Sequence, residues 1–141
     1  MPIIWNKKLS VSNELIDHDH QFLINLINTV ELLLLCKENI SFLLEVFNQL
    51  HEYSVNHFRR EESIQRKIEY NKSLQQKHSH TKLLNELETL KKDISGEKSL
   101  EELTEKADNI IIFLRNWLIN HIIDEDLLMK PYLEKYPVAF S

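Results

Sequence analysis

The sequence is poor in the residues that interrupt or cross-link a chain. Its 141 residues include 1 Gly, 3 Pro and 1 Cys. So few Gly and Pro leave little room for the many turns of a β-sandwich or barrel, and long helices are expected instead. The single cysteine, Cys36, excludes an intramolecular disulfide framework and is typical of a reducing compartment such as the cytoplasm.

Long apolar runs and an excess of basic residues are also missing. The apolar stretches are short and broken by charge, and the N-terminal segment MPIIWNKKLS has no apolar signal core, so neither membrane insertion nor secretion is indicated. The 17 Lys and Arg are outnumbered by 22 Asp and Glu, which gives a net charge of −5 and argues against nucleic acid as a partner. Hydrophobic residues make up 43% of the chain, as in ordinary globular proteins. We expect a single, monomeric, cytoplasmic domain over residues 1–141.

Apolar residues recur at helical spacing in four segments. They predict helices over about residues 11–37, 40–67, 73–94 and 100–130. A short arm, residues 1–9, precedes them, and a tail, residues 131–141, follows. Because the connections are short, neighbouring helices must run antiparallel, and the predicted fold is an all-α, up-down-up-down four-helix bundle.

Polar residues mark the expected helix ends. Ser10 or Ser12 could cap the first helix, and Ser99 with Glu102 forms a capping box for the fourth. Residues 95–98 are the clearest loop. Pro131 is expected to stop the fourth helix.

Histidines stand at core positions, where a polar side chain needs a partner. Each predicted helix offers at least one imidazole at a core position, and two helices add carboxylates nearby: His20, His57 with Glu61, His80, and His121 with Asp124, Glu125 and Asp126. Inward faces of a bundle converge, and metal sites are built there. Imidazole with carboxylate suits Fe, Zn, Cu or Mn, whereas Ca and Mg prefer oxygen ligands alone.

The carboxylate that accompanies His121 is ambiguous from spacing. On a regular helix Glu125, four residues on, shares the face of His121 better than Asp126, five residues on.

Three longer motifs carry a family resemblance: residues 16–20 (IDHDH), 57–62 (HFRREE) and 117–126 (WLINHIIDED). They are similar to I-D-x-Q-H, H-F-x-x-E-E and W-L-x-x-H-I-x-x-x-D of the hemerythrins, and together with Trp5 they extend over nearly the whole chain. The sequence thus resembles a single-domain bacterial hemerythrin. Myohemerythrin is itself a standard example of the up-down bundle.

The resemblance implies two non-haem irons with an oxo or hydroxo bridge, and reversible binding of O2 at the more open iron. By motif match, His20 and His57 hold that iron, Glu61 and Asp126 bridge, and His80 and His121 hold the other. Asp126 is thereby favoured, with Glu125 as the fallback. Trp117 and Leu118 match positions that wall the O2 pocket. An O2 carrier needs no catalytic acid or nucleophile, so we expect no enzymatic activity.

The sequence departs from the family in the third helix. The family has H-x-x-x-H there, and the first of these positions is Gln76 while the second is His80. Gln76 either faces the metal as a weak oxygen ligand or, in the pattern Ser73-x-x-Gln76, bonds back to the N-cap amide. His78 could replace the missing imidazole only if the helix begins irregularly. Asp19 also departs from the family, which usually has Gln there.

Two other functions remain open from the sequence. A sensor of iron, O2 or nitric oxide would act through a separate protein partner, which is unknown. A di-iron or mono-iron oxidase or peroxidase would use the position opened at Gln76, although the E-x-x-H pairs of ferritin-like oxidases are absent.

Overall fold

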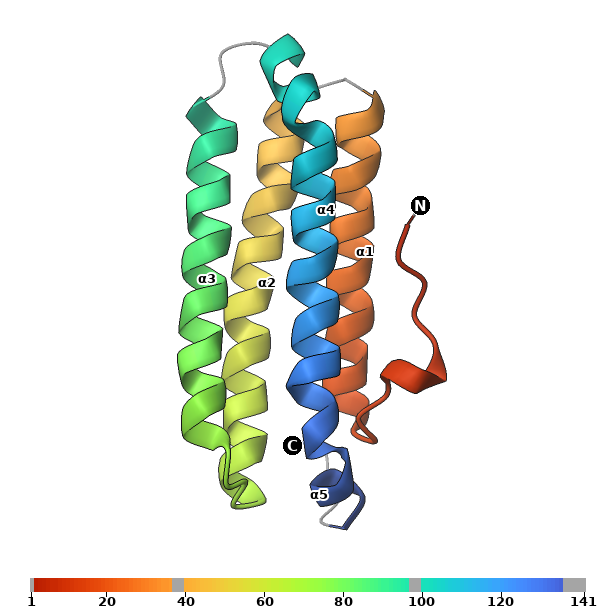
Figure 1. Cartoon of the computed structure of the whole chain (residues 1–141), viewed down its shortest axis with the longest axis vertical. Helices are drawn as coiled ribbons and strands as arrows, with labels where there is room; N and C mark the ends of the chain where they lie inside the picture. The colour runs from red at the N-terminus through yellow and green to blue at the C-terminus, as the bar shows by residue number, and fades with distance from the viewer. Residues whose placement is uncertain (1, 37–39, 97–99, 136–141) are drawn as a thin grey trace.

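The computed structural model describes residues 2–36, 40–96 and 100–135, and its main body is four long helices (Figure 1). They are α1 (Glu14–Cys36), α2 (Ile40–Lys67), α3 (Ser73–Gly96) and α4 (Leu100–Asp124). Successive helices run in opposite directions, α1 packs between α2 and α4, and α2 packs between α1 and α3. The described residues contain no β-strand, and the predicted all-α four-helix bundle is confirmed.

The apolar side of each helix is buried in one of two hydrophobic clusters. The larger cluster fills the bundle along most of its length and includes Leu23, Ile27, Phe47, Leu50 and Leu114. The smaller cluster closes the end near the chain's C-terminal helices and consists of Val11, Ile16, Ile64, Ile68, Tyr70, Met129 and Leu133. The clusters are separate, so a layer of the bundle between them is not apolar.

The first helix begins later than residue 11. Asn13, rather than Ser10 or Ser12, caps it, because the Asn13 Oδ1 atom accepts the amide of Ile16 at 3.0 Å. Ser12 has a φ of 65°, in the left-handed region, and so lies outside the helix.

Asp17 fixes the segment that enters this helix. Its carboxylate accepts the Ser10 hydroxyl at 2.6 Å and the Val11 amide at 2.9 Å. Ser10, predicted as a cap, therefore stabilises the segment before the helix, because its hydroxyl donates to the Asp17 carboxylate in the first turn.

The fourth helix ends at Asp124, earlier than the predicted residue 130. A 3-10 turn, η2 (Asp126–Met129), follows, and then a short helix, α5 (Lys130–Lys135). Pro131 does not stop a helix, because it lies in the first turn of α5, where the missing amide hydrogen has no partner to lose. The third helix is two residues longer than predicted and includes residues 95 and 96 of the expected loop.

Some predicted boundaries lie outside the described residues. These are residue 37 at the end of the first helix, residues 97 and 98 of the loop, Ser99 of the capping box, and the tail from residue 136. Of the helices that are described, none carries an apolar stretch long enough to cross a membrane.

The N-terminal arm is held against α1 by its backbone. The Asn28 side chain accepts the Ile3 amide and donates to the Ile3 carbonyl, each at 2.9 Å. Trp5 packs against the larger cluster, and the turn η1 (Lys7–Leu9) leads the chain round to α1 (Figure 1).

An ion pair joins α1 to α4. Arg115 donates from Nη2 to Glu31, which is 7% exposed. The Arg115 guanidinium lowers the pKa of Glu31 below its ordinary value of 4.5, although burial acts in the opposite direction. Because the folded pKa is depressed, this stabilisation is present above pH 4.5 and is lost as the pH falls further.

Glu31→Gln should lower the free energy of unfolding by about 1–2 kcal/mol at pH 7, since a charged hydrogen bond is lost. The difference from the wild type should shrink as the pH falls below 4.5, because the unfolded chain takes up the proton first and the folded carboxylate follows only at its lowered pKa. Urea unfolding at neutral and acidic pH measures both effects. Glu45→Gln, at an exposed position of α2, is the control, and an equal loss in both variants would contradict the assignment.

Candidate metal centre

A buried polar layer separates the two hydrophobic clusters. It is formed by one or two side chains from each long helix and one from η2, and each is at most 4% exposed: His20, His57, Glu61, His80, His121 and Asp126. Helical spacing explains the layer. In α1, for example, His20 lies between Ile16 of the smaller cluster and Leu23 of the larger one.

Four of these side chains surround a first position. The Nε2 atom of His20 lies 2.9 Å from Oδ2 of Asp126 and 3.8 Å from Oε2 of Glu61. The Nε2 atom of His57 lies 2.9 Å from the same Glu61 oxygen. One ligand atom from each residue lies within 4.8 Å of all the others, as a shared metal ion requires.

A second position adjoins the first and uses the same carboxylates. The Nε2 atom of His80 lies 3.0 Å from Oε1 of Glu61, and that of His121 lies 2.9 Å from Oδ2 of Asp126. These four residues also offer ligand atoms within 4.8 Å of one another. Glu61 and Asp126 therefore belong to both groups, which is the arrangement that two bridged metal ions need.

Several donor atoms in this layer have no hydrogen-bond partner. They are Nε2 of His57, Nε2 of His121 and Oε2 of Glu61, and all three are buried. An unsatisfied buried polar atom is costly. These nitrogen and oxygen atoms lie close together but do not form hydrogen bonds with one another, so the donor set fits metal ions. Its mixture of imidazole and carboxylate suits Fe, Mn, Zn or Cu.

Asp126 reaches the centre because the chain leaves the α-helix before it. The last residue of α4 is Asp124, and Glu125 has φ −121° and ψ −60°, outside helical values. Asp126 is fully buried between His20 and His121. Glu125, which regular helical spacing favours, instead accepts the Nδ1 hydrogen of His121 from the outer side.

Carboxylates accept hydrogen bonds from the Nδ1 atoms of three of the four imidazoles. Glu62 accepts from Nδ1 of His80 at 2.8 Å, and Asp19 accepts from Nδ1 of His57 at 2.9 Å, while Glu125 serves His121. Such contacts fix the tautomer so that Nε2 is the atom presented to a metal, and they make the imidazole a stronger donor.

Asp19 has the most elaborate set of partners. Besides His57, it accepts two bonds from Arg60, each 2.8 Å, and one from the Tyr53 hydroxyl at 2.7 Å. Burial acts to raise the pKa of Asp19, but the hydrogen bonds from His57, Arg60 and Tyr53 outweigh it and lower the pKa to about 2. Asp19 therefore stays charged and continues to accept the hydrogen bond from Nδ1 of His57.

The buried carboxylates and imidazoles of the centre compensate each other's charges. Burial acts to raise the pKa of Glu61, but the charge of His57 and the other imidazoles close to its oxygens hold that pKa well below its usual range. Burial acts to lower the pKa of His121, but the charge of Asp126 outweighs this effect and raises that pKa well above its usual value. The buried carboxylates and imidazoles thus stabilise each other's charged forms.

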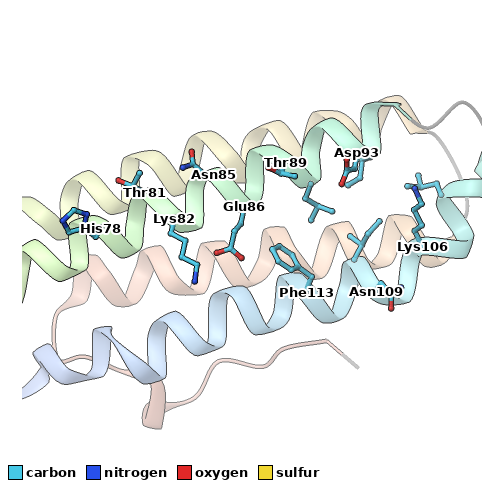
Figure 2. A pocket seen from close by; sticks show the side chains of 14 residues that line it. His78, Thr81, Lys82, Asn85, Glu86, Thr89, Asp93, Lys106, Asn109 and Phe113 are labelled. Atoms are coloured by element: carbon cyan, nitrogen blue, oxygen red, sulfur yellow. The ribbon is translucent and has the colours of Figure 1, made fainter.

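Gln76 points into the centre. It is 4% exposed, its Nε2 atom donates to Oδ1 of Asp126 at 3.3 Å, and its Oε1 atom has no partner. The capping-box alternative is wrong, because the side chain is turned towards η2 and away from the helix start at Ser73. His78 is exposed and lies in a groove outside the centre, so it does not replace the missing imidazole (Figure 2).

Two cavities follow the seam between α3 and α4. The larger, about 950 Å³, is lined in part by apolar side chains that include Ile94, Ile110 and Phe113, and Figure 2 labels Phe113. The smaller, about 350 Å³, shares Phe113 with it and extends to Trp117 and His121. Trp117, whose indole donates to the Leu83 carbonyl at 3.0 Å, therefore lines this cavity together with His121 of the centre.

Leu118, the other residue expected to wall an O2 pocket, is buried in the larger hydrophobic cluster. Sequence reasoning missed the roles of Asp19 and Glu125 and left Glu62 either as a partner of a ligand residue or as an exposed residue; the structure shows the former. A usable signal existed for Asp19, since it lies at core spacing, four residues before Leu23.

The fold and this layer together define a class, the helical bundles that bind cations between their helices. A family model described as the hemerythrin HHE cation binding domain matches residues 11–133, and the chain belongs to the hemerythrin family. Two relatives, each called hemerythrin-like protein, come from Naegleria gruberi and Naegleria fowleri. Each is 27% identical over 132 residues, and the alignment spans 94% of both chains.

Asp19→Asn should lower metal affinity by about 10- to 100-fold, because the neutral amide no longer fixes the charge and orientation behind His57. Anaerobic titration with Fe(II) measures the affinity, and thermal unfolding of the metal-free protein reports on the fold separately.

Glu88→Gln is the matched control. It disrupts a second His–carboxylate pair, in which Nε2 of the partly exposed His51 lies 3.4 Å from Glu88. An Asp19→Asn protein that binds iron as tightly as this control would contradict the positioning role.

Proposed function

We propose that this protein binds O2 at a non-haem di-iron centre and serves O2 storage, delivery or scavenging. The observation that carries the proposal is the pair of donor groups that share Glu61 and Asp126. Membership of the hemerythrin family and the donor chemistry both agree with iron at these positions. When bound, a ferrous pair would supply the electrons that O2 accepts.

The chain's own residues would hold and shield this centre. His20 and His57 would hold the iron that meets O2, while His80 and His121 would hold the other. The hydrophobic clusters lie on both sides of the layer. They would exclude the water and protons that promote loss of reduced oxygen from the site.

Trp117 and Leu118 would form the apolar wall nearest to bound O2. Both are almost fully buried, at 5% and 1% exposure. The seam cavity that reaches Trp117 is a route by which a small neutral molecule could approach this wall from solvent.

Gln76 makes the two metal positions unequal in this proposal. The amide oxygen is neutral and a weaker ligand than the imidazole it replaces. Because its Oε1 atom has no protein partner, it is free to accept a bond from a metal-bound water or to ligate directly. The iron at His80 and His121 would therefore bind less tightly than the iron at His20 and His57.

The remaining parts of the proposal concern setting and activity. Every member of the centre comes from one chain, so a monomer is sufficient to bind both metals. Cys36 is exposed, and a free exposed thiol is compatible with a reducing, cytoplasmic location. We propose a binding protein without catalytic turnover, since an O2 carrier returns its ligand unchanged.

Anaerobic loading with ferrous iron should give two irons per chain, filled in two steps because the donor sets differ. Isothermal titration with metal analysis of the desalted protein measures both the number and the affinities. On adding O2, a visible spectrum that reverses under vacuum is expected. Steady consumption of O2 or peroxide with a reductant would instead indicate an oxidase or peroxidase, and a centre that holds one iron would end the di-iron proposal.

Gln76→His should restore the imidazole and tighten the weaker iron by about tenfold, or about 1.4 kcal/mol. The stronger iron should change little. The same titration resolves the two steps. Gln75→His places an imidazole at the neighbouring exposed position and is the control, and equal tightening in both variants would show that Gln76 is not at the metal.

A further inference from the structure

An aromatic pair lies on the outer face of α1 and α2, directly outside Asp19. The rings of Phe22 and Tyr53 stack with centroids 4.4 Å apart and an interplanar angle of 24°. Phe22 is 47% exposed, which is high for a large apolar side chain, whereas Tyr53 is partly buried beneath it. The stack therefore extends from solvent to the hydrogen-bonded carboxylate.

Hydrogen bonds continue from this pair to the metal centre. The Tyr53 hydroxyl donates to Oδ1 of Asp19 at 2.7 Å, and Oδ2 of the same carboxylate accepts from Nδ1 of His57 at 2.9 Å. The Nε2 atom of His57 belongs to the first metal position. One ring contact, two hydrogen bonds and covalent bonds thus connect an exposed ring to a metal donor atom.

Arg60 holds the geometry of this connection. Its guanidinium donates to both oxygens of Asp19 and lies over the Tyr53 ring, with Cζ 5.4 Å from the centroid. The ring and the carboxylate are therefore fixed relative to each other. Burial and the Asp19 carboxylate raise the pKa of Tyr53 to about 12, so the phenol keeps the proton that it donates.

The ring contacts of the centre through Phe58 and Trp117 involve rings that are themselves almost fully buried. Phe58 stacks on His80 with centroids 4.1 Å apart, and Trp117 lies next to Phe58 at 6.3 Å. Both Phe58 and Trp117 are at most 5% exposed. The path through Phe22 differs because its outermost ring meets solvent.

We propose that Phe22, Tyr53 and Asp19 form an electron-entry route to the metal position at His20 and His57. The inference rests on the proposed function, because a carrier whose irons have been oxidised to the ferric state must be reduced before it binds O2 again. In each event an external one-electron donor of the reduced-flavin class loses one electron and one ferric ion becomes ferrous. No bond in the protein forms or breaks, and any proton lost by the flavin passes to solvent.

The test compares reduction rates of iron-loaded, oxidised protein mixed anaerobically with reduced flavin mononucleotide in a stopped-flow instrument. Loss of the ferric absorption gives the rate. Phe22→Leu and Tyr53→Leu should each slow reduction by about tenfold, equivalent to about 1.4 kcal/mol in the barrier. Tyr53→Phe keeps the ring and loses only the hydrogen bond, so its rate should lie between those of Tyr53→Leu and the wild type.

Phe42→Leu is the matched control. Phe42 is 46% exposed and lies in the first turn of α2, about 22 Å along the helix from His57. This variant should reduce at the wild-type rate. Iron content and thermal unfolding of every variant show whether a slower rate arises from lost metal or a damaged fold.

Wild-type rates in both leucine variants, with full iron content, would overturn the route and leave the proposed function intact. Slowing in Phe42→Leu equal to that in Phe22→Leu would overturn it as well. A wild-type protein that takes up no redox-active iron would refute the proposed function, and the route with it.

Discussion

The sharing of two buried carboxylates among four buried imidazoles is the constraint on which this structure depends. Charged groups are costly inside an apolar bundle unless opposite charges or metal ions compensate them. Glu61 and Asp126 each face imidazoles from several helices. The four helices must therefore keep one register relative to each other, because a shift of one turn would leave these charges unpaired.

Irregular structure, as well as helices, builds the centre. If α4 continued as a regular helix beyond Asp124, the carboxylate of Glu125, four residues after His121, would face the centre. The change to a 3-10 turn instead buries Asp126 and leaves Glu125 outside to hold His121. A local break in helical geometry thus assigns different roles to two adjacent acidic residues.

The surroundings of the centre are asymmetric in three respects. Asp19 connects His57 to an aromatic surface on α1 and α2, whereas the α3–α4 side has cavities and a neutral amide, Gln76, close to Asp126. Hydrogen bonding, access to solvent and the polarity of the neighbouring side chains therefore differ between the two sides of the centre.

The sequence by itself determined the fold class, because helical spacing of apolar residues with few Gly and Pro permits little else, and it also identified the side chains that gather in the buried layer. Helical spacing favoured Glu125 and the family motif favoured Asp126, and the tertiary structure buried Asp126, since α4 ends at Asp124 and the chain continues as a 3-10 turn. The tertiary structure also turned Gln76 inwards and left His78 outside, because α3 begins regularly at Ser73 and positions two apart lie on different sides of a helix. The partners of Asp19 come from residues 34 to 41 positions away in the chain. Contacts over such separations arise from helix packing, which spacing within one helix does not report.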